Sequence, residues 1–405
     1  MSRSARTAQA ARLGAAWMPL TGSAHGIALE ILLDGPLPRS ELARRLDLSA
    51  ASLTRLTKPM LDSGLLVETD SGYDAASGRP TRPLDVDDRS HHFVGVKLTA
   101  DTAYGVLTTL RAEVLAAGEA PLHDRAPGTV ASTVTTLVRS LTEQLGDVAL
   151  ADIRAVGVGL GGLVDATGDL VINARYLDWT SVPLGPMIEE ELGLPVVVDN
   201  DVLSLTRAEQ WFGTARRCDH FAVLTIGEGV GYGLVVHDEV VDRPDAGIGL
   251  LGHFPLDPNG PLCPLGHPGC ADAMLTTGGI TARATTALRR PLSYEQVLDL
   301  ALAGDPVAHR VVDDAARALG RLVAAIGNLT MPRIVVLTGD GIRLAKVSGT
   351  TLAEAIRRDR NPYASPLDVR VQLTGFRDWA RGAAVTAIRT FVLGLRAYDF
   401  HAQHA

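Results

Sequence analysis

The sequence of 405 residues has only three cysteines, no long apolar run and no excess of positive charge. Three cysteines are too few for a disulfide-stabilised scaffold in a chain of this length and are typical of a protein in a reducing cytoplasm. No apolar run reaches the ~18–20 residues that a membrane span requires, and the stretch 13–20 is too short for a signal peptide and contains Pro19. We therefore expect a cytoplasmic protein with no membrane contact.

The net charge of −8 combines two parts of opposite sign. The first 82 residues hold 10 basic and 8 acidic residues, a net charge of +2, and the remaining 323 residues hold 28 basic and 38 acidic residues, a net charge of −10. The acidic total therefore does not exclude nucleic-acid binding by the first part. Because domains usually contain about 100–200 residues, the chain has room for several. We predict domains at 1–84 and 85–405, with residues 1–20 forming a flexible arm.

The N-terminal part has the element order of a winged helix-turn-helix. Apolar residues recur at helical spacing in its first segment, Pro38 suits the first turn of the second helix, and the Ser49 hydroxyl can cap the third. In this arrangement the third helix enters the major groove of DNA, and the wing approaches the backbone or the minor groove. The predicted helices are 24–34, 38–46 and 49–64, and the predicted extended segments are 65–68 and 80–86.

The third helix divides into an apolar and a polar face. Leu53, Leu56 and Met60 would pack inward, while the small and polar residues can approach phosphates and base edges. The alternative is a helical bundle for dimerisation, in which Arg55 and Lys58 merely face solvent. The predicted DNA-contacting residues, including one in the wing, are Ser49, Ala50, Ser52, Thr54, Arg55, Lys58 and Arg79.

Two prolines constrain this predicted surface. Pro59 lies inside the third helix and removes the N–H that would bond to the carbonyl of Arg55, so a kink or an early helix end is expected there. Arg79 lies between Gly78 and Pro80, in a narrow extended segment suited to an A·T-rich minor groove.

After residue 85, strands and helices alternate twice over, which predicts two α/β lobes. No short-period repeat or low-complexity tract interrupts them. The predicted strands are 93–98, 104–110, 113–117, 155–160, 195–199, 221–226, 231–237, 334–337 and 369–373. The predicted helices are 130–145, 202–211, 280–288, 294–303, 307–326 and 380–395, of which the long apolar helices 307–326 and 380–395 would pack in a core or, alternatively, between lobes or subunits.

Four segments of this body carry a family signal. They are a strand running into a Gly-rich turn (157–165), a strand that ends in Asn-Asp (196–201), the glycine-rich segment LTIGEGVGYG (224–233) and the His- and Cys-containing segment 250–272. In this order, behind a winged helix-turn-helix, they resemble the ROK family of repressors, open reading frames and kinases. The resemblance spans about residues 21–398. It implies a sugar-kinase-like body of the actin/hexokinase fold, in which a ribonuclease H-like α/β lobe is duplicated.

The resemblance also indicates that this body has lost kinase activity. ROK kinases carry an Asp-x-Gly-Gly-Thr loop for ATP phosphate and metal, and here Lys97 stands at the Asp position while Thr99 and Ala100 replace the glycines. A cation cannot help to hold Mg²⁺, and Glu228 would repel a triphosphate. We expect no enzyme activity and no bound ATP. The alternative is an active sugar kinase with an accessory N-terminal domain.

A sugar site is implied by the family residues that the chain retains. Asn200 and Asp201 match the family's Asn-Asp pair, His253 matches its Glu-x-Gly-His segment, and Asp272 stands for its final Glu. Leu250 replaces the Glu of that segment, so one charge-assisted hydrogen bond is missing. An unusual sugar is one outcome; loss of sugar binding, with Asn200 and Asp201 as a polar turn, is the other.

Zinc is the implied cofactor, with an altered ligand set. The family site has one His and three Cys, and here Leu265 replaces the middle Cys. His253, Cys263 and Cys270 leave one corner of a tetrahedron, which His267 or water could fill. The alternative is a loop that folds without metal.

These features predict a DNA-binding transcriptional regulator, a repressor of carbohydrate-related genes, controlled by a sugar-like effector between the lobes. It would bind a double-stranded operator as a homodimer or homotetramer, because paired helix-turn-helix modules read paired half-sites. Effector binding would shift the population of lobe closure and so the separation of the recognition helices. A third alternative is an effector-independent regulator controlled by a protein partner.

Overall fold

The computed structural model describes residues 20, 22–70, 72–73, 80–88, 91–146, 148–243 and 245–394. They fall into two units: unit 1 combines Met1–Ala208 with Trp379–Ala405, and unit 2 is Glu209–Asp378. Among the helices in these ranges, none has both the length and the apolar character to cross a bilayer. The predicted domain limits at 84 and 85 stay a prediction.

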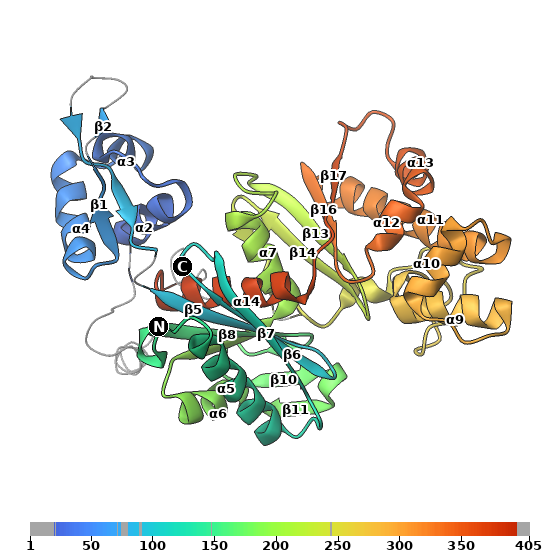
Figure 1. Ribbon diagram of the computed structural model, residues 1–405. Coiled ribbons are helices and arrows are strands. Elements are labelled where there is room, and N and C mark those ends of the chain that lie inside the picture. The colour runs from blue at the N-terminus through green and yellow to red at the C-terminus, as the bar shows by residue number, and fades with distance from the viewer. Residues whose placement is uncertain are drawn as a thin grey trace. The chain divides into compact units, whose positions relative to one another are not determined.

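Unit 1 begins with the winged helix-turn-helix, and its element order confirms the prediction (Figure 1). The first and last strands of the module form the antiparallel pair β1–β4, and a second short pair, β2–β3, lies between them in sequence. The elements are α2 (Ser23–Asp34), α3 (Arg39–Arg45), α4 (Ala50–Asp62), β1 (Leu66–Glu68), β2 (Gly72–Tyr73), β3 (Pro80–Thr81) and β4 (Leu84–Val86). Its core is built by Ile27, Ile31, Leu32, Leu42, Leu53, Met60, Leu66 and Leu84.

Helix α4 continues past its proline. Pro59 lies inside the helix, which ends at Asp62, so the expectation of an early end at this residue is wrong. The Thr57 side chain is buried as well and donates its hydroxyl to the Leu53 carbonyl at 2.9 Å, which satisfies a polar group on the inward face. Pro38 is the N-cap of α3 rather than a residue of its first turn.

The first α/β lobe, also in unit 1, contains a five-stranded sheet in the order β12-β8-β5-β6-β7. Strands β5, β8 and β12 are parallel, and β5, β6 and β7 pair antiparallel. Figure 1 shows α5 and α6 on one face and α14 on the other. The bounds are β5 (His92–Leu98), β6 (Thr102–Thr108), β7 (Val114–Pro121), α5 (Pro127–Glu143), β8 (Ile153–Leu160), β9 (Leu163–Val164), β10 (Val171–Ala174), β11 (Trp179–Val182), α6 (Leu184–Leu192), β12 (Val196–Asn200), α7 (Asp201–Phe212) and α14 (Phe376–Phe391).

Unit 2 repeats this topology. Its sheet has the order β15-β14-β13-β16-β17, again with three antiparallel strands followed by two strands parallel to the first. Two sheets of order 3-2-1-4-5 confirm the duplicated ribonuclease H-like fold of the actin/hexokinase class. The bounds are β13 (His220–Ile226), β14 (Val230–Val236), β15 (Glu239–Val240), α8 (Ala271–Leu275), α9 (Thr277–Leu288), α10 (Tyr294–Leu302), α11 (Pro306–Leu329), β16 (Ile334–Thr338), α12 (Arg343–Val347), α13 (Gly349–Asp359) and β17 (Asp368–Val371).

The long late helices lie in cores. Helix α11 buries one face in the hydrophobic core of unit 2 and packs beside α13. Helix α13 is not among the helices predicted from the sequence. Helix α14 lies directly on the sheet of unit 1: a Cβ on Gly95 would be 1.9 Å from the carbonyl oxygen of Ala380, and a Cβ on Gly157 would be 1.9 Å from that of Ala383. Only residues without a side chain permit this approach.

We expect Gly157→Ala to destabilise unit 1, because the added methyl group must push α14 off the sheet. Overpacking of a tight core costs typically about 1–3 kcal/mol in the free energy of unfolding, and backbone contact at this distance places the variant at the upper end. Urea unfolding followed by circular dichroism measures the change.

Gly128→Ala is the matched control, since a Cβ at this position in α5 has no neighbour within 4 Å. It should be neutral or slightly stabilising, by up to about 1 kcal/mol, because Ala favours helix more than Gly. Equal stability of both variants and the parent would contradict the contact between α14 and the sheet.

Candidate functional site

The predicted DNA-reading face of α4 is exposed. Ser49 caps the helix by accepting the Ser52 N–H at 3.1 Å, so the backbone at the helix start is ordered. Ala50, Thr54 and the two cations that follow are exposed, and Ser52 is half-buried. The seventh predicted contact, Arg79, lies outside the described residues.

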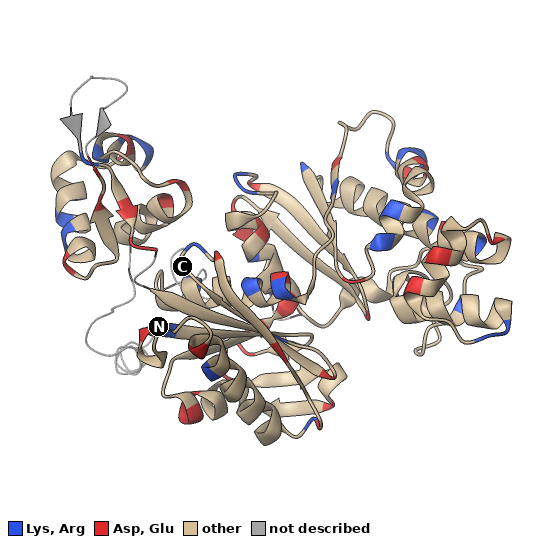
Figure 2. Ribbon diagram, in the orientation of Figure 1, with Lys and Arg blue, Asp and Glu red and all other residues tan. Residues whose placement is uncertain are grey.

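The cations of the module divide into two groups (Figure 2). Within the described ranges, Arg55 and Lys58 form no ion pair, whereas each other Arg of residues 22–88 is bound to a carboxylate. The pairs are Arg39–Glu68, Arg44–Glu41, Arg82–Glu68, and Arg45 with Glu30, Asp34 and Glu41. Positive charge that remains available to a polyanion is therefore concentrated on the exposed face of α4.

Asn200 and Asp201 lie where β12 passes into α7. The Asn200 side chain donates to the Gly162 carbonyl at 3.0 Å and accepts the backbone N–H of Val202 and Leu203 at 3.0 and 3.1 Å. It thus caps α7 and holds the Gly-rich turn after β8. Asn200 and Asp201 are both buried, at 5% and 7% exposure. The hydrogen bonds of Asn200 stabilise the local fold whether or not a ligand is bound.

Lys97 forms a buried ion pair with Asp201. Its ammonium donates to Oδ2 of Asp201, while Oδ1 accepts the Val202 N–H at 2.8 Å. The Lys97 nitrogen also lies 5.1 Å from the ring centroid of Trp379, at the start of α14, in a cation–π contact. Both carboxylate oxygens are therefore already bonded to the protein.

The Lys97–Asp201 pair was not anticipated from the sequence, although a signal for it exists. Residues i and i+2 of a strand share a face, so Lys97 lies on the same face of β5 as Gly95, which contacts α14. A lysine inside the buried strand HFVGVKL needs a counter-charge. The sequence separation of 104 residues hides which carboxylate supplies it.

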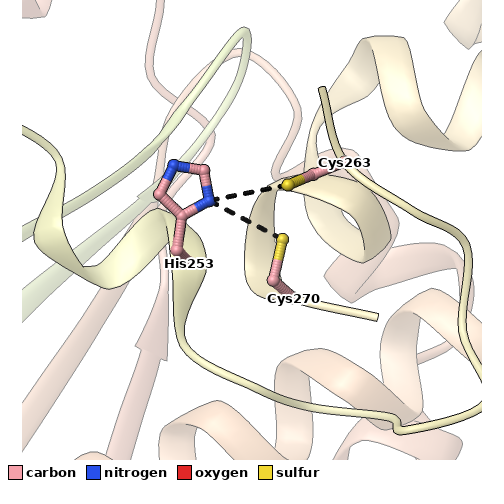
Figure 3. Close-up of side chains that lie close together, drawn as sticks. All are labelled: His253, Cys263 and Cys270. Atoms are coloured by element: carbon pink, nitrogen blue, oxygen red, sulfur yellow. Dashed lines mark hydrogen bonds between the residues drawn. The ribbon is translucent and has the colours of Figure 1, made fainter. Parts of the chain in front are cut away.

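In unit 2, His253 lies between two cysteines and a carboxylate. Its Nδ1 is 3.8 Å from the sulfur of Cys263 and 3.8 Å from that of Cys270 (Figure 3). Its Nε2 is 4.0 Å from Oδ2 of Asp272. The predicted fourth metal residue, His267, is exposed, with its Nδ1 3.7 Å from the Cys263 sulfur.

The two thiols differ in acidity. Burial opposes ionisation of Cys263, yet hydrogen bonds from the His267 and Leu265 backbone leave its pKa below the usual value. Burial raises the pKa of Cys270.

The structure brings the four predicted effector residues together as two pairs, Asn200 with Asp201 in unit 1 and His253 with Asp272 in unit 2.

The ROK family profile matches residues 93–389, which is most of the chain. The chain belongs to the ROK family. The DNA-binding transcriptional dual regulator NagC of Escherichia coli (strain K12) is 25% identical over 359 residues, covering 84% of this chain and 88% of NagC. A glucokinase of Thermotoga maritima is 31% identical over 237 residues, covering 54% of this chain and 74% of that enzyme.

A solved structure confirms the fold across module and body. The ROK family transcriptional regulator that is a homolog of the E. coli MLC protein superposes with a TM-score of 0.78 at 24% sequence identity. The match covers 92% of this chain and 97% of that chain. It therefore extends well beyond residues 93–389, into the winged helix-turn-helix.

Proposed function

We propose that this chain is a cytoplasmic DNA-binding transcriptional regulator, a repressor of carbohydrate-related genes, that reads its operator with α4. The observation that carries the proposal is the exposed α4 face, where Arg55 and Lys58 are the cations that no described carboxylate neutralises. The similarity to NagC along 84% of the chain supports it. The described cysteines are free thiols, which suits a reducing compartment.

The regulator acts as a homodimer or homotetramer on a palindromic operator. A single module with so few available cations gains little from phosphate contacts, because the non-specific affinity for DNA grows with the number of phosphates neutralised. Two modules related by a two-fold axis read two half-sites about one helical turn, or a multiple, apart. Pairing thus supplies the affinity that one module lacks.

A sugar or sugar derivative controls the regulator. The retained family residues carry this part of the proposal. In unit 2, His253 and Asp272 offer an imidazole and a carboxylate to sugar hydroxyls, and in unit 1 each Asp201 oxygen keeps one lone pair that can accept from a sugar hydroxyl. His253 and Asp272 keep 29% and 24% of their side chains exposed, so a ligand can reach them. Asn200 supports the site by capping α7 behind Asp201.

Operator binding by variants of α4 tests the proposal. We expect Lys58→Ala to weaken binding to all sequences alike and to lower the salt slope by about 0.9 per half-site, about 1.8 for two modules on one operator, since it removes one phosphate contact from each module. Arg55→Ala should cost about 1–3 kcal/mol and relax base preference at one position of each half-site. Selection of duplexes from a random pool, followed by fluorescence anisotropy at several salt concentrations, measures both effects.

Arg44→Ala is the matched control, because it removes one positive charge from the same module while its guanidinium is already bound to Glu41 at 2.7 Å. We expect operator affinity within about twofold of the parent, as for a neutralised exposed pair. If the two α4 variants bind like the parent and the control, α4 does not face DNA.

We also propose that the body does not phosphorylate sugars. A kinase of this fold uses the Asp of the Asn-Asp pair as the base for the acceptor hydroxyl, and here Lys97 and the Val202 N–H bond to both Asp201 oxygens. The Lys97 ammonium also repels Mg²⁺ from the end of β5, where the resemblance places the metal-binding loop of ROK kinases. Similarity to the Thermotoga maritima glucokinase makes the alternative worth measuring.

A coupled ADP-release assay with ATP, Mg²⁺ and a panel of hexoses should show no turnover above background. The Thermotoga maritima glucokinase is the positive control in the same buffer. Hexose-dependent turnover that the Asp201→Asn variant abolishes would show that the chain is a kinase, because a contaminating enzyme would not respond to that substitution.

We propose a zinc ion as the cofactor of unit 2. Zn–S bonds of about 2.3 Å and Zn–N bonds of about 2.0–2.1 Å at tetrahedral angles place neighbouring ligand atoms about 3.5–3.8 Å apart. His253 Nδ1 is 3.8 Å from both sulfurs, which fits these edges. The ligand atoms of His253, Cys263 and Cys270 all lie within 4.8 Å of one another, and His267, whose Nδ1 is 3.7 Å from the Cys263 sulfur, or a water fills the fourth position in place of the family's third Cys. The other ring nitrogen of His253, Nε2, lies 4.0 Å from Oδ2 of Asp272 and is not used as a metal ligand.

Metal analysis of the purified chain tests the zinc proposal. We expect about one zinc per chain in the parent and in Cys218→Ser, since Cys218 donates instead to the His220 carbonyl at 3.3 Å. Cys270→Ser should lose the metal. His267→Ala should retain zinc with an affinity about 10–100-fold lower in competition with a chelator. A parent that stays metal-free after incubation with ZnCl₂ would contradict the proposal.

A further inference from the structure

Arg111 connects the first lobe to the DNA-binding module. It lies in the turn between β6 and β7, and its guanidinium donates to the carbonyls of Leu32 at 3.1 Å, Ile31 at 3.2 Å and Gly35 at 3.3 Å. The same group pairs with Asp85 of β4 at 2.5 Å. One side chain of the lobe thus bonds to the first helix and to the wing of the module.

The electrostatics of this contact are favourable. The last carbonyls of a helix have no partner within the helix and carry partial negative charge, so a guanidinium at the end of α2 is stabilised there. Its carboxylate partner Asp85 accepts the Val86 N–H at 2.9 Å and is therefore itself oriented. Arg111 and Asp85 keep only 21% and 16% of their side chains exposed, which limits screening by solvent.

A second contact holds the recognition helix. His91, at 3% exposure, bonds through Nε2 to the carbonyl of Gly64, just after α4, at 3.2 Å, and its Nδ1 accepts from Arg154 of β8 at 3.2 Å. Burial lowers the pKa of His91, in keeping with a neutral ring that accepts on one side and donates on the other. The C-terminal ends of α2 and α4 are therefore both bonded to the lobe.

The turn that carries Arg111 is fixed in its own right. Arg381 of α14 donates to the Ala112 carbonyl at 2.7 Å, and the Thr109 hydroxyl accepts the N–H groups of Arg111 at 3.2 Å and Glu113 at 3.3 Å. The first turn of α14 also carries Trp379, whose ring lies 5.1 Å from the Lys97 nitrogen. One helix therefore contacts both the Lys97–Asp201 pair and the turn that holds the module.

We propose that Arg111 and His91 are positioning residues that fix α2 and α4 to the first lobe, and so set the half-site spacing that the regulator accepts. A module on a flexible tether would tolerate many spacings. A module bonded at two helix ends presents α4 in one orientation per subunit. The DNA part of this inference rests on the proposed function; the structural part does not.

Hydrogen exchange tests the structural part without DNA. In Arg111→Gln we expect the amides at the end of α2 (residues 31–35) to exchange about tenfold faster, because the helix end loses three hydrogen bonds to a charged donor. Peptides of α5 should exchange as in the parent, which shows that the lobe remains folded. Arg111→Lys keeps the positive charge but lacks the several N–H donors of a guanidinium, so its exchange rate at residues 31–35 should lie between those of the parent and Arg111→Gln.

Arg125→Gln is the matched control. Arg125 is also an arginine of the first lobe bound to a carboxylate, Asp178 at 2.9 Å, and to a carbonyl, that of Ala100 at 3.2 Å, but it does not touch the module. Its substitution should leave exchange at residues 31–35 unchanged. Parent-like exchange there in Arg111→Gln, or equal acceleration by both substitutions, would overturn the proposal.

Operator spacing tests the DNA part, with a duplex selected by the parent and the same duplex lengthened by about five base pairs, half a helical turn, between half-sites. The parent should bind the duplex of selected spacing at least about tenfold more tightly than the lengthened duplex. Arg111→Gln should lose most of this preference, while its affinity for a single half-site stays within about threefold of that of the parent. Equal weakening on every duplex would mean a merely structural role and overturn the proposal. If the parent binds no duplex, the proposed function is refuted, and the hydrogen-exchange experiment alone then tests whether Arg111 fixes α2 to the lobe.

Discussion

The direct contact of α14 with the sheet of unit 1 is the constraint on which the rest of this lobe depends. At Gly95 and Gly157 the helix backbone lies where a side chain would otherwise be. This sets both the height and the register of α14, so that Trp379 meets Lys97 and Arg381 meets the turn after β6. A sheet with ordinary side chains at these positions would hold the helix several ångströms further away and would break both contacts.

The Lys97–Asp201 ion pair compensates a buried charge in the first lobe. In a buried strand end a lone Asp201 would carry an uncompensated charge, which is costly in a low-dielectric interior. Lys97 supplies the compensating charge from within the chain. This cation is part of the chain and is present whether or not a ligand is bound, which suits a regulator that must be folded before its ligand arrives.

The sequence predicts the parts of this structure that depend on local patterns. Helical spacing and a Ser cap identify α2 and α4, and apolar runs between glycine-rich turns identify the central strands. The short strands β9–β11 and the helices α6 and α13 were not predicted, because they owe their stability to the sheet and to α11 rather than to a pattern of their own. Retained family residues predict Asp201 and His253 as members of the candidate site. The pairs Lys97–Asp201 and Arg111–Asp85 join segments far apart in the sequence, so spacing along the chain does not predict them.

The distribution of charge explains why geometry must decide operator affinity. Four of the module's arginines are bound to its own carboxylates, and among the described residues only Arg55 and Lys58 remain for DNA on α4. A module of this kind cannot rely on counterion release, which grows with the number of phosphates neutralised. In the proposed dimer, affinity comes from placing two recognition helices on two half-sites at once, and that gain disappears when the spacing does not fit. In this proposal the hydrogen bonds that orient α4 on the lobe are as important to recognition as the residues on its exposed face.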